Sequence, residues 1–442
     1  MNTTFNVSEF LERSFKTFRI KIFIICGLII AIEAYDQLVL GSILVPLSKA
    51  FGTTPAGMVP VMIAQGLGMA TGAYTISVLA DRIGRRWAII ICTLMFGLMT
   101  LLVNTSTTVM QFAVWRFLAF LFLGGVIPNL YAIVVEYYPK KLREQMIVYM
   151  NVIIGAMAGI SMMVAPVLLQ KFGWNMIFWI GGIVPLILLP FVYFFLPESI
   201  RFLILREGNN DKVAGILKSM DPKLDLTGVV DYTIEEQKSG KSPIIGLFRN
   251  KRYRSTILIW IAMALTTGLI NPVYMQWMPT IFHQYGGIPV AEAGRMMIGH
   301  SVGSIAAPFL LVIISTYLMK TKYAVAMFSA LAGILFLSLN FIDSYSNLGW
   351  LITLVAWGFC GSSMLCGINA IAAVAYPTEM RATGIGWAQG AARFTAIFAP
   401  FLGALIIGQR WSLMSISLTF MIPLLIAAIA IYFLPYNSDE HS

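Results

Sequence analysis

The sequence predicts an all-α polytopic membrane protein with 12 transmembrane helices in two six-helix halves. Three observations predict this fold class: the composition, the series of long apolar runs and the placement of positive charge. Of the 442 residues, 58% are hydrophobic and 11% are charged, whereas a soluble domain usually carries about 25% charged residues. A chain this long and this apolar could not cover its surface with polar groups in water.

The apolar runs have roughly the 20 residues that a helix needs to cross the hydrocarbon core. The expected spans are 21–47, 57–79, 88–104, 109–137, 146–169, 175–196, 255–282, 293–318, 323–342, 348–375, 384–408 and 412–434. A long polar stretch separates the sixth run from the seventh. We therefore expect an N-terminal six-helix half at 1–196, a cytoplasmic central loop at 197–254, and a C-terminal six-helix half with a short tail at 255–442.

Positive charge is distributed unevenly between alternate loops. With a cytoplasmic N-terminus, the inward-facing loops hold 24 of the 30 Lys and Arg residues, and the outward-facing loops hold four. Positive residues are retained on the cytoplasmic side of a membrane, so both termini are expected inside. The net charge of +10 is then explained by the positive residues of the cytoplasmic loops and does not indicate nucleic-acid binding. The polar N-terminal residues 1–18 lack the apolar core of a signal peptide, so the first span is expected to act as the insertion signal.

The two halves also resemble each other at a fixed offset of 238 residues. The matching segments are Tyr138-Pro139-x-x-x-Arg143 with Tyr376-Pro377-x-x-x-Arg381, and Leu196-Pro197 with Leu434-Pro435. Both matches fall at equivalent span ends, which supports duplicated six-helix halves. Such halves typically enclose a central site near the bilayer midplane and rock around it.

The loop between the second and third spans combines an acid, a glycine and several arginines. It reads Leu79-Ala80-Asp81-Arg82-Ile83-Gly84-Arg85-Arg86. This loop strongly resembles the signature loop of the major facilitator superfamily. The resemblance implies the major facilitator fold and a gating role for Asp81, Arg82, Gly84, Arg85 and Arg86, since an acid and guanidinium groups at helix ends can latch neighbouring helices. The alternative is that these positive residues only set the topology.

Further segments resemble the aromatic acid:proton symporters of that superfamily. They are Gly124-Gly125-x-x-Pro128-Asn129 in the fourth span, and Gly384-x-Gly386-Trp387 with Arg393 and Pro400 in the eleventh. The first span of that family typically reads Asp-Gly-aromatic-Asp, and this chain has Glu33-Ala34-Tyr35-Asp36. The resemblance covers essentially the whole chain and implies proton-coupled transport of a small organic acid.

Ionisable side chains inside a span are costly, so they are functional candidates by default. Glu33 and Asp36 lie three residues apart on one helical face, and two carboxylates this close do not ionise together easily. With Arg116 and Glu136 they are the candidate proton-coupling residues. One alternative is that a carboxylate pairs permanently with an arginine to fix helix packing. For Glu136, the alternative is a latch contact with the basic loops.

The residue expected to bind the carboxylate group of the substrate is Arg393, in the eleventh span. A guanidinium cannot lose its charge, so at mid-depth it must face an anion or a water-filled cavity. The alternative is a permanent pair with Asp36, and both contacts can occur in alternation.

The seventh span is the candidate source of aromatic walls. This span contains Pro272, which is expected to break the helix. The candidate residues near it in the sequence are Asn271, Tyr274 and Trp277. Together with Tyr35 these side chains are candidates for binding a ring, and the alternative is a packing or lipid-belt role. In the eighth span, His300 is expected to be structural, with titration as the alternative.

The sequence contains no Walker-type phosphate loop, metal-ligand cluster or catalytic constellation. We therefore expect no enzyme activity, no metal and no cofactor. The prediction is a monomeric proton symporter of a bacterial inner membrane that imports a small anionic carboxylate such as a hydroxybenzoate or a muconate. Its expected partners are this anion, protons and the lipid bilayer. The alternatives are a proton antiporter that exports drugs or organic ions, and a transporter-like sensor that binds ligand without moving it.

Overall fold

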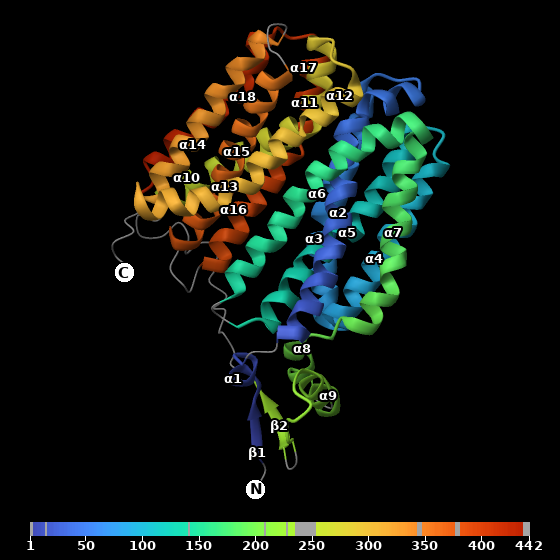
Figure 1. The fold of residues 1–442 in the computed structure, drawn as a ribbon, viewed down its shortest axis with the longest axis vertical. Helices are drawn as coiled ribbons and strands as arrows, with labels where there is room; N and C mark the ends of the chain where they lie inside the picture. Colours follow the sequence, from blue (N-terminus) through green and yellow to red (C-terminus); the bar gives the residue numbers. More distant parts are fainter. Residues whose placement is uncertain are drawn as a thin grey trace. The chain divides into compact units, whose positions relative to one another are not determined.

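The computed structural model describes residues 3–13, 16–139, 142–206, 209–226, 229–234, 253–342, 347–375 and 381–435. Long helices dominate these residues (Figure 1), in agreement with the predicted helical membrane fold. Residues 235–252 of the central loop, the Tyr376-Pro377 segment and the tail from 436 onward lie outside the described residues.

The described elements fall before and after the stretch 235–252 of the central loop. Before it lie β1 (Thr3–Asn6), α1 (Val7–Leu11), α2 (Lys16–Ala50), η1 (Pro55–Met58), α3 (Val59–Ile83), α4 (Arg85–Leu102), η2 (Val103–Thr105), α5 (Val109–Tyr137), α6 (Arg143–Phe172), α7 (Trp174–Phe195), α8 (Ile200–Ile204), α9 (Asn210–Met220) and β2 (Val229–Thr233). After it lie α10 (Tyr253–Met263), the π-helical η5 (Ala264–Ile270), α11 (Asn271–Gly286), α12 (Val290–Met296), α13 (Ile298–Tyr317), α14 (Thr321–Leu335), η6 (Phe336–Phe341), α15 (Asn347–Ala375), α16 (Arg381–Ala396), α17 (Ala399–Gly408) and α18 (Leu413–Tyr432).

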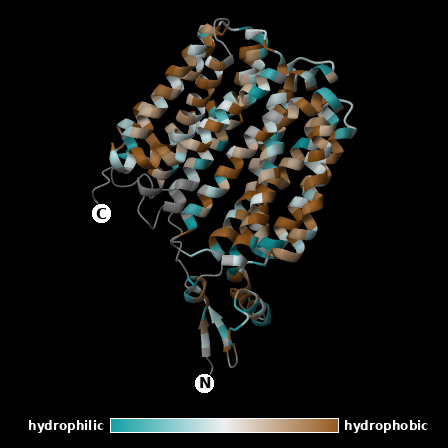
Figure 2. Ribbon diagram, viewed as in Figure 1, coloured by the Kyte–Doolittle hydropathy of each residue, from teal (hydrophilic) through white to brown (hydrophobic). Residues whose placement is uncertain are grey.

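Eleven helices in the described ranges are long and apolar enough to cross a membrane. α6 completes the predicted set of spans, with 30 residues and a shorter apolar stretch at Gln145–Met157. Apolar residues line these helices (Figure 2), and large apolar side chains such as Phe194 and Val312 are exposed. Such a surface is unusual for a protein in water but suits contact with lipid.

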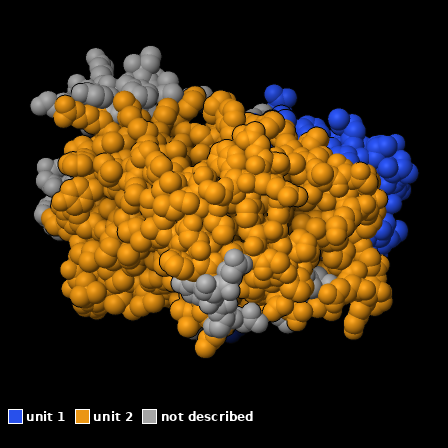
Figure 3. Space-filling view, turned by 90° about the horizontal axis from the view of Figure 1, so that it is seen from above, with its two compact units in different colours: residues 1–36, 64–157, 175–238 blue, residues 37–63, 158–174, 239–442 orange. Residues whose placement is uncertain are grey.

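Packing divides the chain into two compact units, which Figure 3 colours separately. Unit 1 contains residues 1–36, 64–157 and 175–238, and unit 2 contains residues 37–63, 158–174 and 239–442. The boundaries fall inside α2, α3 and α6. The predicted division at residues 197 and 254 stays a prediction.

The 238-residue offset relates Arg143, the first residue of α6, to Arg381, the first described residue of α16.

A short parallel sheet joins the N-terminus to the central loop within unit 1. β1 pairs with β2 so that Thr4 lies opposite Asp231 and Phe5 lies opposite Tyr232. The Phe5 ring also contacts Phe10 and Tyr232, with centroid distances of 5.7 and 6.2 Å. We call β1, α1, α8, α9 and β2 the N-terminal subdomain. The sequence patterns predict no such structure, and these strands are the one departure from helix among the elements of the described residues.

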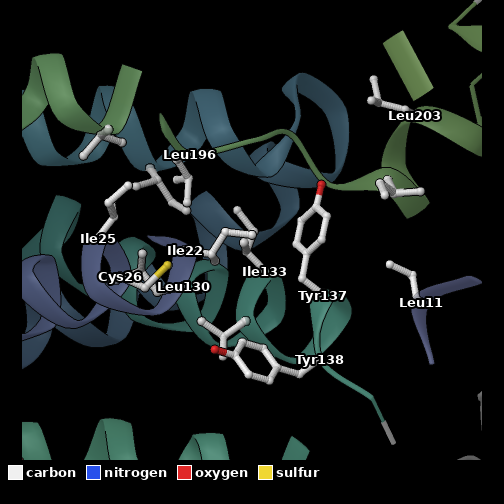
Figure 4. Packing of buried hydrophobic residues seen from close by; sticks show 14 of the residues in the cluster. Leu11, Ile22, Ile25, Cys26, Leu130, Ile133, Tyr137, Tyr138, Leu196 and Leu203 are labelled. Atoms are coloured by element: carbon white, nitrogen blue, oxygen red, sulfur yellow. The ribbon is translucent and has the colours of Figure 1, made fainter. Parts of the chain in front are cut away.

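A buried cluster connects this subdomain to the long helices of unit 1 (Figure 4). Arg19 on α2 donates from Nε to the Tyr137 carbonyl oxygen at 2.8 Å and from Nη2 to the Leu11 carbonyl oxygen at 2.5 Å. Burial raises the pKa of the Tyr138 hydroxyl, so this group keeps its proton. The hydroxyl is the donor of a hydrogen bond to the Arg19 carbonyl oxygen at 3.0 Å. The start of α2 is thereby tied to α1 and to the end of α5.

The seventh span differs from the prediction that Pro272 breaks the helix. The chain continues from α10 through η5 into α11 without a break, and the irregularity is the π-helical turn that ends at Ile270. Proline has no N–H and its ring crowds the preceding turn. A wider π turn before Pro272 accommodates this without ending the helix, and such turns are frequent at functional sites.

The eleventh span is instead divided. α16 ends at Ala396 and α17 begins at Ala399, with Pro400 near its first position. α16 packs closely on η5, because a Cβ added to Gly268 would lie 1.8 Å from Thr395 Oγ1 and 2.4 Å from the Ala392 carbonyl oxygen. Discontinuous helices of this kind occur at the substrate sites of transporters.

Candidate functional site

A fully buried ion pair joins α2 to α5 in unit 1. Arg116 Nη1 lies 2.9 Å from Asp36 Oδ1 and 2.7 Å from Oδ2, and Nη2 donates to the Asp36 carbonyl oxygen at 3.1 Å. Both side chains have no exposed surface. A buried charge pair is tolerated only when its remaining hydrogen-bonding groups are also satisfied, so the surroundings of Arg116 matter.

Gln65 on α3 completes the hydrogen bonding of this guanidinium. With its amide oxygen turned toward Arg116, Gln65 accepts from Nη2 at 2.6 Å and from Nε at 2.9 Å. The Phe120 and Phe178 rings lie 4.7 and 5.2 Å from Arg116 Cζ, where their faces attract a cation. Three helices and two rings thus hold one charge pair in place.

Glu33 lies one turn before Asp36 in a different environment. Its side chain is 3% exposed and lines a small apolar cavity formed with Ile29, Ile32, Thr93, Phe96, Pro185 and Leu188. Glu33 Oε2 and Thr93 Oγ1 have no hydrogen-bond partner among the described residues. An ionised carboxylate without a partner is costly in such surroundings, so this site accommodates the neutral acid.

Tyr35 lies between these two acids in the sequence, and its side chain is buried in the structure. Its hydroxyl donates to the Ile177 carbonyl oxygen on α7 at 3.4 Å. In this structure its polar atom therefore serves a contact between helices, and the predicted role in binding a ring stays a prediction.

The loop that resembles the superfamily signature forms a network with the end of α5 and the start of α8, all in unit 1. Arg85 Nη1 lies 3.0 Å from Glu136 Oε2. Glu136 also accepts from Ser199 Oγ at 2.9 and 2.8 Å and from the Arg201 N–H at 2.5 Å. This arrangement matches the latch contact considered for Glu136 and occupies both of its carboxylate oxygens.

Glu198 closes the same network at the start of α4. Its Oε1 accepts from the Arg86 N–H at 3.0 Å and the Ser199 N–H at 2.8 Å, where the positive end of the helix dipole favours an acid. Gly84 has φ 97°, and a Cβ there would lie 2.3 Å from Glu198 Oε2. Only glycine fits this turn. Asp81 and Arg82 are exposed at the end of α3.

In unit 2, the seventh span contributes to a cavity of about 370 Å³, its open mouth included. Asn271 and Tyr274 line it, together with His300, Phe336 and Trp357. Trp277 does not line this cavity; it is fully buried and lies against Gly403.

Arg393 lies in the last turn of α16, just before the interruption of the eleventh span, and its side chain is exposed. Its helix packs on η5, directly before Asn271. The cation and the cavity of the seventh span therefore belong to the same unit. In this structure Asp36 pairs with Arg116, and the role of Arg393 as a ligand for the substrate anion stays a prediction.

The structure brings Asp36 together with Arg116, and Glu136 together with Arg85. Gln65, Glu198 and Ser199 were not predicted from the sequence. Gln65 is a polar residue in an apolar run, which is a signal for a buried hydrogen bond. Glu198 and Ser199 lie in the segment Pro197-Glu198-Ser199-x-Arg201, which resembles transporters of this superfamily, and that resemblance is the signal that could have pointed to them.

Comparison with known proteins agrees with this architecture. A family model described as Major Facilitator Superfamily matches residues 26–394. The gallate transporter of Pseudomonas putida is 31% identical over 416 residues, which cover 93% of this chain and 90% of that protein. The 4-hydroxybenzoate transporter of Acinetobacter baylyi is 32% identical over 415 residues, which cover 92% of this chain and 89% of that protein.

A solved structure shows the same fold at lower sequence identity. The D-xylose-proton symporter matches with a TM-score of 0.73 and 15% identity, and the match covers 94% of this chain and 97% of that one. This likeness concerns the fold alone, whereas the family match and the two relatives above concern the sequence. The chain therefore belongs to the Major Facilitator Superfamily, a family of multi-pass membrane transporters and not of enzymes.

Proposed function

We propose that this protein is a proton-coupled symporter that imports a small aromatic carboxylate. The observation that carries the proposal is the buried Asp36–Arg116 pair, one helical turn from Glu33, whose Oε2 has no hydrogen-bond partner among the described residues. The names of the two relatives, a gallate transporter and a 4-hydroxybenzoate transporter, support the substrate class.

Asp36 and Glu33 take up protons from outside. A proton on Asp36 removes the negative charge that holds Arg116, and a proton on Glu33 removes the cost of an unpaired anion in an apolar cavity. Since both acids lie on α2, the proton load changes which packing of this helix is most stable. Coupling requires that protons bind to the two conformations with different free energies.

Arg393 binds the substrate carboxylate. Its guanidinium offers a planar fork of donors that matches a carboxylate in two hydrogen bonds. The nearby interruption between α16 and α17 allows the helix end to adjust as the anion arrives. Asn271 and Tyr274 then contribute polar and aromatic groups from the seventh span.

The latch around Glu136 and Glu198 regulates opening toward the cytoplasm, and both termini lie on that side. The excess of positive charge in alternate loops supports this orientation. The bacterial origin of the two relatives supports the inner membrane as the location, where the protein acts as a monomer.

The test is uptake by proteoliposomes of labelled benzoate, 4-hydroxybenzoate and gallate, with an aliphatic acid for comparison, with and without an inward proton gradient. We expect accumulation of the aromatic acids that the gradient stimulates. Arg393→Ala should lower uptake roughly tenfold or more, because removing one partner of a charge pair costs about 2–5 kcal/mol. Arg393→Lys should retain part of the activity, because it keeps the charge and loses the fork.

Lys49→Ala serves as the matched control, because it removes an exposed positive charge at the end of α2. Binding of these acids without accumulation under any gradient contradicts the symporter and favours the sensor. Release of protons when an organic cation is added contradicts it in favour of the antiporter.

A further inference from the structure

One face of α4, in unit 1, carries a series of buried polar atoms. Thr93 and Thr100 are two turns apart and so lie on the same face of this helix. Asn104 follows one turn later, in η2, and Ser106 comes directly after η2. The two threonine hydroxyls, both amide atoms of Asn104 and the Ser106 hydroxyl are buried and have no hydrogen-bond partner among the described residues. We call these four residues the α4 polar row.

The α4 polar row passes both acids of α2. Thr93 lines the small cavity that contains Glu33. Thr100 approaches Asp36 beside Gly181 of α7, where an added Cβ would lie 3.2 Å from Asp36 Oδ1 and 3.4 Å from Thr100 Cγ2. Because glycine has no side chain, α7 places no atom between Thr100 and the carboxylate at this point. The face of α4 with the row is therefore the face that meets the two candidate proton sites.

The side of the ion pair between α5 and α7 is apolar. Phe112 of α5 and Phe178 of α7 are fully buried and meet edge to face, with a centroid distance of 5.3 Å. Phe112 lies one turn before Arg116, toward the start of α5, and Phe178 lies 5.2 Å from Arg116 Cζ. Two packed rings do not conduct protons. Polar atoms that could lead to Asp36 are therefore found on the α4 side.

The two threonines of the row differ from a threonine with a purely structural contact. Thr75 Oγ1 on α3 donates to the Thr71 carbonyl oxygen at 2.8 Å, the usual bond to the preceding turn of the helix. Thr93 and Thr100 make no such bond among the described residues. Buried polar atoms nearly always have partners, and water supplies them in protein interiors, typically with about three hydrogen bonds for each molecule. The hydroxyls of the row are thus available to bind water.

We infer that water held along the α4 polar row delivers protons from the outer side of the membrane to Asp36. This inference rests on the proposed function and deepens it, because it names the path by which the coupling proton arrives. The end of the row at Asn104 lies in a loop predicted to face outward, and the neighbouring Thr105 is exposed, so water enters there.

The transfer moves one proton without a net change in the row. A proton enters at the outer end, each water accepts it and passes on one of its own, and the Asp36 carboxylate becomes a neutral acid. Arg116 then loses the anion that holds it. Thr93 extends the row to the cavity of Glu33, the second acid of the same helix.

The experiment measures three rates in proteoliposomes that contain the full chain, with labelled benzoate, 4-hydroxybenzoate and gallate. They are uptake driven by an inward proton gradient, proton entry reported by trapped pyranine, and exchange of labelled for unlabelled acid without a gradient. Thr100→Val keeps the shape of the side chain and removes the hydroxyl. It should lower the first two rates roughly three- to tenfold, the loss expected for one hydrogen bond. Exchange should continue, because it needs no new proton.

Gly181→Ala is an independent variant on another helix. It places a methyl group between Thr100 and Asp36 and should slow the same two rates. Thr100→Ser keeps a hydroxyl and should retain most of the wild-type rates. Thr105→Val is the matched control, because the Thr105 hydroxyl is exposed and already donates to the Leu102 carbonyl oxygen at 2.7 Å. This control should leave all three rates unchanged, and every variant is checked for a monodisperse elution profile.

The outcomes separate this inference from the proposed function. If the wild type couples uptake to proton entry and both Thr100→Val and Gly181→Ala match it, the water path is wrong and the symporter stands. An equal loss of all three rates in these variants also overturns the path, because a defect that includes exchange is structural. If the wild type accumulates none of the acids under a proton gradient, both proposals fall.

Discussion

Arg116 and Asp36 are 80 residues apart in the sequence, and the guanidinium of one contacts both carboxylate oxygens of the other, at 2.9 and 2.7 Å. Neither side chain is exposed. The pair also carries a backbone contact, from Nη2 to the Asp36 carbonyl oxygen, so it fixes the helix as well as the side chain. A pair of this kind is stable only while both charges are present.

Removal of one partner should destabilise the fold. Asp36→Ala leaves Arg116 buried without its anion, and we expect the free energy of unfolding to fall by about 3–5 kcal/mol. The double variant Asp36→Ala, Arg116→Met should be closer to the wild type, because no uncompensated charge remains. Unfolding in detergent, followed by circular dichroism, measures both. A double variant that is as unstable as the sum of its single variants contradicts this role for the pair.

Glu33→Gln should separate proton coupling from substrate binding. The side chain keeps its size and Glu33 Oε2 has no partner to lose among the described residues, so we expect a folded protein. Gradient-driven accumulation should be lost, while exchange of labelled for unlabelled substrate without a gradient should continue. Glu9→Gln, an exposed acid on α1, is the control. Accumulation at the wild-type level in Glu33→Gln would place the coupling on Asp36 alone.

Gly84→Ala should be more damaging than the same change at another glycine with positive φ. At Gly52 (φ 64°) an added Cβ meets nothing within 4 Å, so Gly52→Ala should cost only about 1–2 kcal/mol for the left-handed backbone. At Gly84 the Cβ also collides with the Glu198 carboxylate. We expect a larger loss of stability and of transport, measured by thermal unfolding and uptake. Equal effects of the two variants would exclude the collision as the cause.

The pairing of β1 with β2 is open to a direct chemical test. Thr4 and Asp231 lie opposite each other in the register, at a strand spacing that a disulfide can bridge. The variant Thr4→Cys, Asp231→Cys, in a background without the four natural cysteines, should form an intramolecular disulfide. Peptide mapping by mass spectrometry under non-reducing conditions detects it. The mismatched pair Thr4→Cys, Thr233→Cys should oxidise much less, and equal oxidation of both pairs would contradict the register.

Most of the helical fold could be predicted because each span carries its own signal. The run at 109–137 predicts the bounds of α5, since an apolar run of about twenty or more residues between polar loops is typical of a transmembrane helix. β1 and β2 are different. Each has four or five residues, and their partnership depends on segments more than 220 residues apart in the chain. No local pattern contains that information.

The candidate site shows the same distinction. Asp36 and Arg116 were identifiable because charge in an apolar run is costly wherever it points. That they pair with each other depends on how α2 and α5 pack, which neither run specifies. Trp277 illustrates the limit for aromatic residues, because its position in the sequence does not distinguish a cavity wall from a core residue. His300 shows the converse: that its Nδ1 has no hydrogen-bond partner in the described part of the chain can be seen only in the folded structure.

The parallel sheet has a consequence for biosynthesis. β1 is translated long before β2, and α2 through α7 must be made and inserted in the interval. The N-terminal strand therefore has no partner to pair with until residue 233 has left the exit tunnel. An affinity tag fused directly before Thr3 would sit at the strand that must complete this late step, so a tag at the C-terminal end is the safer choice for expression.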